Sequence, residues 1–165
     1  MEIKRNFTIN QPADRVWEVL GNQFGQACEW VTGLYHSEAS GNPASGNAQS
    51  VKRTCDTNQG KIKEEIRAFD PKNYHLSYAV IEGFPSFVKS GVNTWRLMPK
   101  GNKTEVDVHF VAELQGVLGF LMKPIMRMQL GKVFDQAVND LKVFVETGKP
   151  SQAKSKELAK RAARA

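Results

Sequence analysis

The chain has few cysteines and no long apolar run. Cys28 and Cys55 are the two cysteines among 165 residues. Two cysteines do not make a disulfide framework, and their spacing matches no metal or redox pair. No stretch reaches the roughly 20 apolar residues that cross a bilayer. The opening residues, MEIKRN, are charged and lack the apolar region of a signal peptide. These absences predict a cytoplasmic protein in a reducing compartment.

Signatures of catalysis and metal binding are also missing. His36, His75 and His109 fall on different predicted strands, without the spacing of metal ligands. No Ser–His–Asp or Cys–His arrangement is evident, and the glycine-containing segment 41–47 lacks the Lys-Ser/Thr of a phosphate loop. We therefore predict no metal, no cofactor and no assignable catalytic residue. The sequence favours a protein that is not an enzyme, without deciding the question.

Positive charge is concentrated at the C-terminal end. The net charge is +6, and residues 148–165 hold six Lys and Arg against Glu157, which leaves +5 there and +1 for the preceding 147 residues. We interpret residues 1–147 as the folded domain and residues 148–165 as a basic tail. The tail is either a solvated, partly helical extension or an electrostatic contact for anionic lipid or RNA. We expect no specific nucleic-acid site.

Residues 116–147 form the most informative segment. Polar residues recur at spacings near four, and apolar residues mark the other side, which predicts one long amphipathic helix that ends before Gly148 and Pro150. Pro124 lies either in the first turn or inside a longer, kinked helix. The first half is apolar almost all round, so we expect more than one of its faces to be covered. Residues 117–130 are then the expected pocket wall or gate.

The rest of the domain has the pattern of a meander of strands. Residues 3–10 alternate like a strand, and a helix near 12–20 and a short helical segment at 28–31 follow. Strands are then expected at 34–40, 48–55, 60–69, 73–81, 86–98 and 103–114. The connections are short, so neighbouring strands should be antiparallel, which predicts the α+β class.

Three segments carry a resemblance to a known superfamily. They are FTINQPADRVWEVLGNQFGQACEW, EEIRAFDPKNYHLSYAVIEG, and TEVDVHF followed by a long helix that ends in DLKVFVE. In this order the sequence resembles the START-like, helix-grip superfamily (SRPBCC), which includes polyketide cyclase/dehydrase and lipid transport proteins and pollen-allergen-like proteins. The resemblance covers residues 3–147. One departure is that CEWVTGL lacks the proline common just after the tryptophan.

The resemblance implies a helix-grip fold. In that fold a curved, seven-stranded antiparallel sheet surrounds the long C-terminal helix, two short helices follow strand 1, and sheet and helix enclose a largely apolar pocket. It implies no single chemistry, because the superfamily holds carriers, receptors, cyclases and chaperone regulators. Function therefore has to be argued from the pocket.

Alternation along the strands predicts which side chains face that pocket. The expected ligand-binding residues lie on the inward faces of strands, in the 82–87 turn or on the apolar side of the helix: Ile62, Glu64, Ile66, Tyr78, Phe84, Phe87, Asn93, Trp95, Val108, Phe110, Leu121, Ile125 and Met128. The polar members Glu64, Tyr78 and Asn93 are expected to meet and hydrogen-bond one end of an apolar ligand. Alternatively, Glu64 lies solvated at the cavity mouth and the other two pair only with backbone. Phe84 and Phe87 form either a lid or a locally packed turn.

Three classes of function remain open. The first and favoured one is binding or transport of a hydrophobic small molecule, such as a lipid, an isoprenoid or a polyketide-like compound. The second is a cyclase or dehydratase in which Glu64 acts as a base beside Tyr78. The third is an interaction module whose basic tail binds RNA or an acidic partner.

Overall fold

The computed structural model describes residues 1–41 and 51–163. The chain begins with strand β1 (Glu2–Ile9), helix α1 (Ala13–Trp17), a π-helical turn η1 (Glu18–Asn22) and a 3-10 segment η2 (Phe24–Glu29). The strands that follow are β2 (Leu34–Ser40), β3 (Lys52–Thr57), β4 (Gly60–Asp70), β5 (His75–Glu82), β6 (Val88–Lys100) and β7 (Lys103–Leu114). Two helices, α2 (Gly116–Thr147) and α3 (Gln152–Ala162), complete the chain.

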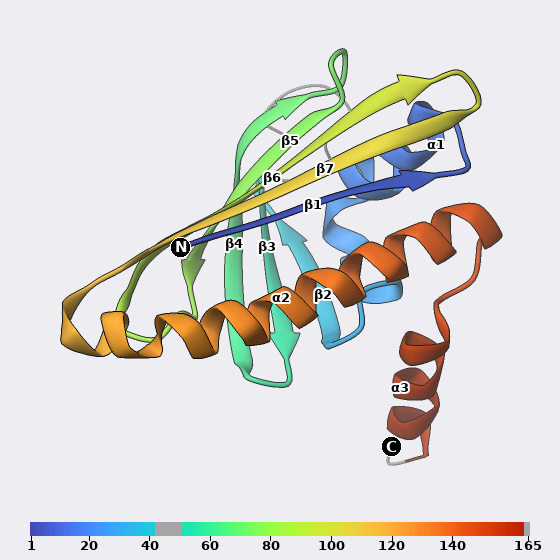
Figure 1. Cartoon of the computed structure of the whole chain (residues 1–165). Coiled ribbons are helices and arrows are strands. Elements are labelled where there is room, and N and C mark those ends of the chain that lie inside the picture. The colour runs from blue at the N-terminus through green and yellow to red at the C-terminus, as the bar shows by residue number, and fades with distance from the viewer. Residues whose placement is uncertain (42–50, 164–165) are drawn as a thin grey trace.

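The seven strands form one antiparallel sheet in the order β1-β7-β6-β5-β4-β3-β2. The sheet bends strongly, so that β2–β4 run almost crosswise to β1 and β7, and α2 passes along its open side (Figure 1). The predicted α+β class, the curved seven-stranded sheet, the presence of short helical elements after β1 and the long C-terminal helix are confirmed. Residues 42–50, which include the start of the predicted strand 48–55, lie outside the described residues.

Two strands begin later than the sequence predicts. Strand β5 begins at His75 because Tyr74 has a left-handed backbone (φ 49°) in the turn that Asp70 organises by accepting from the Lys72 and Asn73 amides. Strand β6 begins at Val88, whose amide donates to the carbonyl of Pro85. Phe87 therefore belongs to the turn and not to the strand.

A row of side chains crosses the concave face of the sheet. Register pairs Ile66 with Tyr78, Tyr78 with Asn93, Asn93 with Phe110 and Phe110 with Ile3. These five residues are all buried. Because side chains alternate between the two faces of a strand, this register places Tyr78 and Asn93 side by side on a face that is otherwise apolar.

Helix α2 has the predicted bounds, and it contains Pro124 in its interior, so the first-turn alternative for Pro124 is wrong. Its second half is packed against the sheet through Phe134, Leu141 and Val145, all buried. Large apolar side chains of the first half are instead exposed: Val117, Leu118, Phe120, Leu121, Ile125 and Met128. The expectation that several faces of this half are covered is therefore wrong, because the sheet reaches only one side of it.

The basic tail is docked and not simply solvated. Ser151 caps α3 by accepting from the Lys154 amide, and its hydroxyl donates to buried Asp140 of α2. Lys154 is fully buried, and its ammonium donates to the carbonyl of Leu34 at 2.7 Å and to Glu157. Glu157 in turn accepts from the Gly33 amide at 2.7 Å. The outer side of α3 remains exposed and basic. This polar seam fixes the C-terminal half of α2 and α3 to the start of β2.

Candidate functional site

The three predicted polar residues come together on the concave face. Glu64 of β4, Tyr78 of β5 and Asn93 of β6 are 6%, 9% and 6% exposed. The amide Nδ2 of Asn93 donates to the Tyr78 hydroxyl at 2.8 Å. The alternative in which Glu64 lies solvated at the mouth is therefore wrong, and the Tyr78–Asn93 contact is between side chains and not with backbone.

Arg53 of β3 belongs to the same cluster and was missed from the sequence. It lies opposite Glu64 in register, is 7% exposed, and donates through Nε to Glu64 at 2.5 Å. Its Nη1 donates to the carbonyl of Phe24 at 2.8 Å, and its guanidinium lies over the Phe24 ring at 4.0 Å. The signal was available: a carboxylate predicted to be buried needs a cation, and Arg53 alternates in phase with the apolar Cys55.

Charge and burial set the protonation of this cluster. Burial alone would lower the pKa of Arg53, but the adjacent Glu64 carboxylate outweighs it and raises that pKa above its ordinary value. Burial, with the charge of Glu64, raises the pKa of Tyr78, although the charge of Arg53 and the contacts with Trp95 and Asn93 oppose this. Burial also raises the pKa of Cys55 to about 12. At neutral pH, Arg53 is therefore charged, and the phenol and the thiol are neutral.

The hydrogen bonds of the cluster divide it into two pairs. Glu64 is bonded to Arg53, with the Cys55 thiol 3.8 Å away, whereas Tyr78 is bonded to Asn93. The Oε2 atom of Glu64 is already occupied as the acceptor of the Arg53 Nε–H. This arrangement is suited to holding charge in place more than to moving a proton.

One polar atom of the cluster has no partner. The side-chain oxygen Oδ1 of Asn93 is buried and accepts no hydrogen bond from the part of the chain that the structure describes. The indole Nε1 of Trp95, two residues along the same face of β6, also lacks a hydrogen bond of normal geometry. A buried polar atom without a partner costs about 1–3 kcal/mol. Such an atom on the concave face is a natural contact for a ligand donor.

The turn between β5 and β6 closes the interior at one end. The Phe84 ring lies on Gly91 so closely that a Cβ there would be 2.5 Å from Phe84 Cε2 and 3.2 Å from Phe110 Cζ. The carbonyl of Phe87 accepts from the Gln115 amide at 2.9 Å, which ties the turn to the start of α2. The structure thus shows local packing of this turn onto the sheet; a movable lid stays a prediction.

Helix α2 presents a different face to the interior than the sequence suggested. Its inner stripe, which is buried or half-buried, consists of Gly119, Met122, Met126, Leu130 and Phe134. The rings of Phe134 and Phe110 lie 5.2 Å apart across the interior.

Leu121, Ile125 and Met128 lie on the outer side of α2, with exposed fractions of 61%, 44% and 58%. The structure does not bring them together with the strand residues. Because this half of the helix is apolar on all sides, its sequence does not indicate which side faces the sheet. The inner stripe could therefore not be distinguished from the side that holds Leu121, Ile125 and Met128. Of the remaining predicted residues, Ile66, Trp95, Val108 and Phe110 are buried core, and Ile62 is half-buried beside Gly83.

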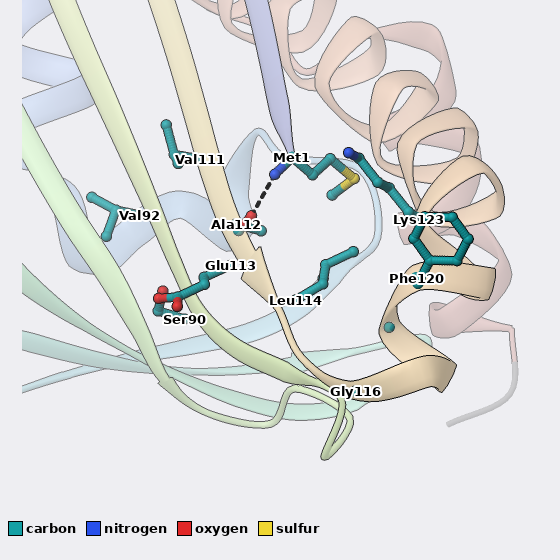
Figure 2. A pocket seen from close by; sticks show the side chains of 11 residues that line it. Met1, Ser90, Val92, Val111, Ala112, Glu113, Leu114, Gly116, Phe120 and Lys123 are labelled. Carbon is teal, nitrogen blue, oxygen red and sulfur yellow. Dashed lines mark hydrogen bonds between the residues drawn. The ribbon is translucent and has the colours of Figure 1, made fainter.

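A groove of about 590 Å³ lies where β6, β7 and the start of α2 meet. Figure 2 shows Val92 and Val111 on one side, Phe120 and Lys123 of α2 on the other, and Met1 between them. The Met1 amino group donates to the Ala112 carbonyl at 2.6 Å. None of the thirteen predicted ligand-binding residues lines this groove. It touches the inner stripe of α2 through Gly119.

Two absences hold for residues 1–41 and 51–163. No group of three His, Cys, Asp or Glu side chains there is arranged to hold a metal ion. Within the same residues, no helix is long and apolar enough to span a membrane.

Comparisons with known proteins agree with this geometry. The family model described as polyketide cyclase / dehydrase and lipid transport matches residues 1–146. Among curated protein sequences, none matches this chain. Of the solved structures, an uncharacterized protein from Bacillus thuringiensis has a TM-score of 0.69 at 15% identity, covering 86% of this chain and 96% of its own.

Two further structures illustrate the range of proteins with this fold. Norcoclaurine synthase from Thalictrum flavum, solved as a point mutant with a transition-state analogue, has a TM-score of 0.69 at 13% identity, covering 88% of this chain and 93% of its own. A START superfamily protein from Mycobacterium smegmatis has a TM-score of 0.68 at 11% identity, covering 88% of this chain and 97% of its own. At these identities the likeness shows the shared fold alone.

Proposed function

Because the chain belongs to the polyketide cyclase/dehydrase and lipid transport family, we propose that it binds and carries a hydrophobic small molecule between the first half of α2 and the concave face of the sheet. One observation carries this proposal. The inner stripe of α2 is only half-buried at Met122, Met126 and Leu130, and it faces an interior in which the buried Asn93 Oδ1 has no partner.

The entrance is the end of the groove that Leu114 and Gly119 line, since Val92 and Val111 at its other end belong to the convex face. The groove's volume of about 590 Å³ falls in the usual range for small-molecule sites, about 300–1,000 Å³. The groove and the inner stripe share Gly119, and the Phe84 ring separates this end from the polar cluster by lying on Gly91. Entry of a ligand therefore requires Phe84 to leave Gly91. Methionines at Met122 and Met126 suit ligands of varied shape, because the methionine side chain is flexible and polarizable.

The polar cluster recognises one end of the ligand. Asn93 Oδ1 accepts a hydrogen bond from a ligand hydroxyl or similar donor, while the rest of the ligand packs on Phe110, Phe134 and the inner stripe. Arg53 and Glu64 neutralise each other and hold the Phe24 and Tyr78 rings in place. The pairing of Glu64 with Arg53 supports a carrier over an enzyme that uses Glu64 as a base. A lipid, an isoprenoid and a polyketide alcohol all meet this description.

Native mass spectrometry of gently purified full-length protein tests the proposal. We expect a co-purifying hydrophobic molecule, or uptake of one from a panel of fatty alcohols, fatty acids, isoprenoid alcohols and phenols. Asn93→Leu removes the acceptor and should weaken binding of the alcohols by about tenfold, the value of one lost hydrogen bond, while hydrocarbon analogues bind as before.

The matched control is Thr94→Val, one residue along β6 with its side chain on the opposite, convex face. It should leave ligand affinity unchanged. Absence of any co-purifying or panel ligand would overturn the proposal, and so would equal effects of the two variants.

A further inference from the structure

The outer side of α2 changes character halfway along the helix. One stripe at helical spacing runs through Val117, Leu121, Ile125 and Met128, which we call the outer stripe, and continues through Lys132, Asp135 and Asn139. The continuation is polar, as a solvent-facing stripe should be. The outer stripe is entirely apolar, yet Val117 is 77% exposed and its other members are 44–61% exposed. The same side of one helix therefore has polar side chains facing water in its second half, and in its first half it has apolar side chains that no residue among 1–41 and 51–163 covers.

The charged residues between Glu113 and Asp135 have a single sign. Between Glu113 and Asp135 the chain has no acidic residue, but it has Lys123, Arg127 and Lys132, all exposed. The two acids at the ends are already paired: Glu113 accepts from Lys89 at 2.9 Å and Asp135 from Arg5 at 2.5 Å. Lys123 and Arg127 lie one turn apart on the side of α2 that faces the β1 edge, where each lines a hollow.

We propose that the outer stripe docks this protein on an anionic phospholipid surface. In this docked state α2 lies in the plane of the interface, with Leu121 and Ile125 among the acyl chains. Lys132, which continues the stripe, lies against the headgroups, and Lys123 and Arg127 lie on the opposite, polar side of the helix within a Debye length of the anionic surface. Such a helix needs an apolar face, a polar face with Lys and Arg, and no ability to span the bilayer. A second copy of the chain is a poorer occupant, because a two-fold contact along this part of α2 would bring together two segments that each hold three cations and no acidic residue.

The docking surface lies beside the groove at the start of α2. Phe120 and Lys123 line that groove and are next to the outer stripe in sequence. A docked protein would thus present the groove to the lipid layer. The proposal itself does not rest on the function proposed above, since vesicle binding is measured without any carried ligand.

Flotation of the full chain with vesicles tests the proposal. We expect binding to phosphatidylcholine vesicles that contain 30% phosphatidylserine, with weaker binding to phosphatidylcholine alone and release by 0.5 M salt. Leu121→Gln with Ile125→Gln should weaken binding at least about tenfold, because it removes two inserting side chains. Lys123→Gln with Arg127→Gln should weaken it by about 25-fold, about fivefold for each charge.

Matched controls separate the outer stripe from the basic tail. Leu158→Gln changes a leucine of α3 that is 40% exposed, and Lys156→Gln with Lys160→Gln removes two exposed cations of the same helix. Neither control should alter vesicle binding. The thermal midpoints of all variants should match that of the parent, since every changed side chain is exposed.

Insertion has its own readout. The three native tryptophans, Trp17, Trp30 and Trp95, are buried. Leu121→Trp should therefore report the outer stripe through a blue shift on anionic vesicles and through quenching by brominated lipid.

The proposal is overturned if the parent protein does not bind anionic vesicles. It is also overturned if the tail variants abolish binding while Leu121→Gln with Ile125→Gln does not. Sedimentation that shows a dimer dissociated by Leu121→Gln with Ile125→Gln, without vesicle binding, would assign the outer stripe to a second copy instead.

Discussion

Replacing Glu64 with leucine leaves the Arg53 guanidinium buried without a counter-charge. The two side chains are 8% and 7% exposed and are joined at 2.5 Å, so neither reaches bulk water when the other is removed. Arg53 would keep its hydrogen bond to the Phe24 carbonyl and its place on the Phe24 ring. Breaking one side of a buried ion pair costs about 3–5 kcal/mol. We therefore expect Glu64→Leu to lower the free energy of unfolding by about 3–5 kcal/mol.

Removing both charges should restore most of the free energy of unfolding that Glu64→Leu loses. The double variant Arg53→Met with Glu64→Leu replaces the pair by apolar side chains of similar length, and such replacements are often neutral or stabilising. We expect this variant to unfold within about 1 kcal/mol of the parent protein. For a chain of this size the single variant should melt about 6–20 °C lower, at about 2–4 °C per kcal/mol.

Urea unfolding followed by tryptophan emission measures these free energies. Lys63→Met is the matched control, since Lys63 is on the same strand and pairs with Glu82 at 2.8 Å, but both side chains are about half exposed. It should cost less than about 1 kcal/mol. If Glu64→Leu costs no more than this control, the cluster is not a buried ion pair and the reasoning fails.

Two smaller predictions concern the tail and the thiols. Lys154→Met removes the buried ammonium contacts to Leu34 and Glu157, so amides of residues 152–162 should exchange with deuterium at least tenfold faster; unchanged exchange would show that α3 docks without this contact. Cys28 should react with a disulfide reagent at pH 8 in the folded protein, whereas buried Cys55, with its pKa raised to about 12, should react only after unfolding. Because the folded state holds the Cys55 proton more tightly, its contribution to stability is present below the ordinary pKa of 9.0 and is lost as pH rises toward 12. Two fast thiols at pH 8 would contradict this.

Much of the fold was predictable because local signals agreed with one another. The bounds of α2 follow from a polar stripe that repeats over its second half and from Gly148, which adopts the left-handed conformation at the end of the helix. The strand alternation likewise placed Glu64, Tyr78 and Asn93 on one inward face. Because the turns between strands are short, strands that follow one another in the sequence were predicted to pair antiparallel.

The parts that were missed depend on contacts between distant segments. Arg53 is 11 residues from Glu64 along the chain, and its burial is decided by the register of β3 against β4 and by Phe24. In the sequence, Lys154 is indistinguishable from the solvated lysines of the tail. Its burial depends on contacts with the Leu34 carbonyl at the start of β2 and with Glu157. The orientation of the first half of α2 was not predictable either, since its residues are apolar on every side.

Pro124 gives α2 a mechanical property beyond its sequence pattern. Proline has no amide hydrogen, so position 124 donates no helical hydrogen bond to the carbonyl of Phe120, four residues earlier. The proline ring also crowds that carbonyl. Bends in helices concentrate at such positions. The second half of α2 is fixed by buried Asp140, which accepts from the Thr32 amide at 2.8 Å. The hydrogen-bond ladder of the helix is therefore interrupted near the end that joins β7, and a bend at this point would move the first turns of α2 together with the 82–87 turn without unwinding the part that holds the sheet.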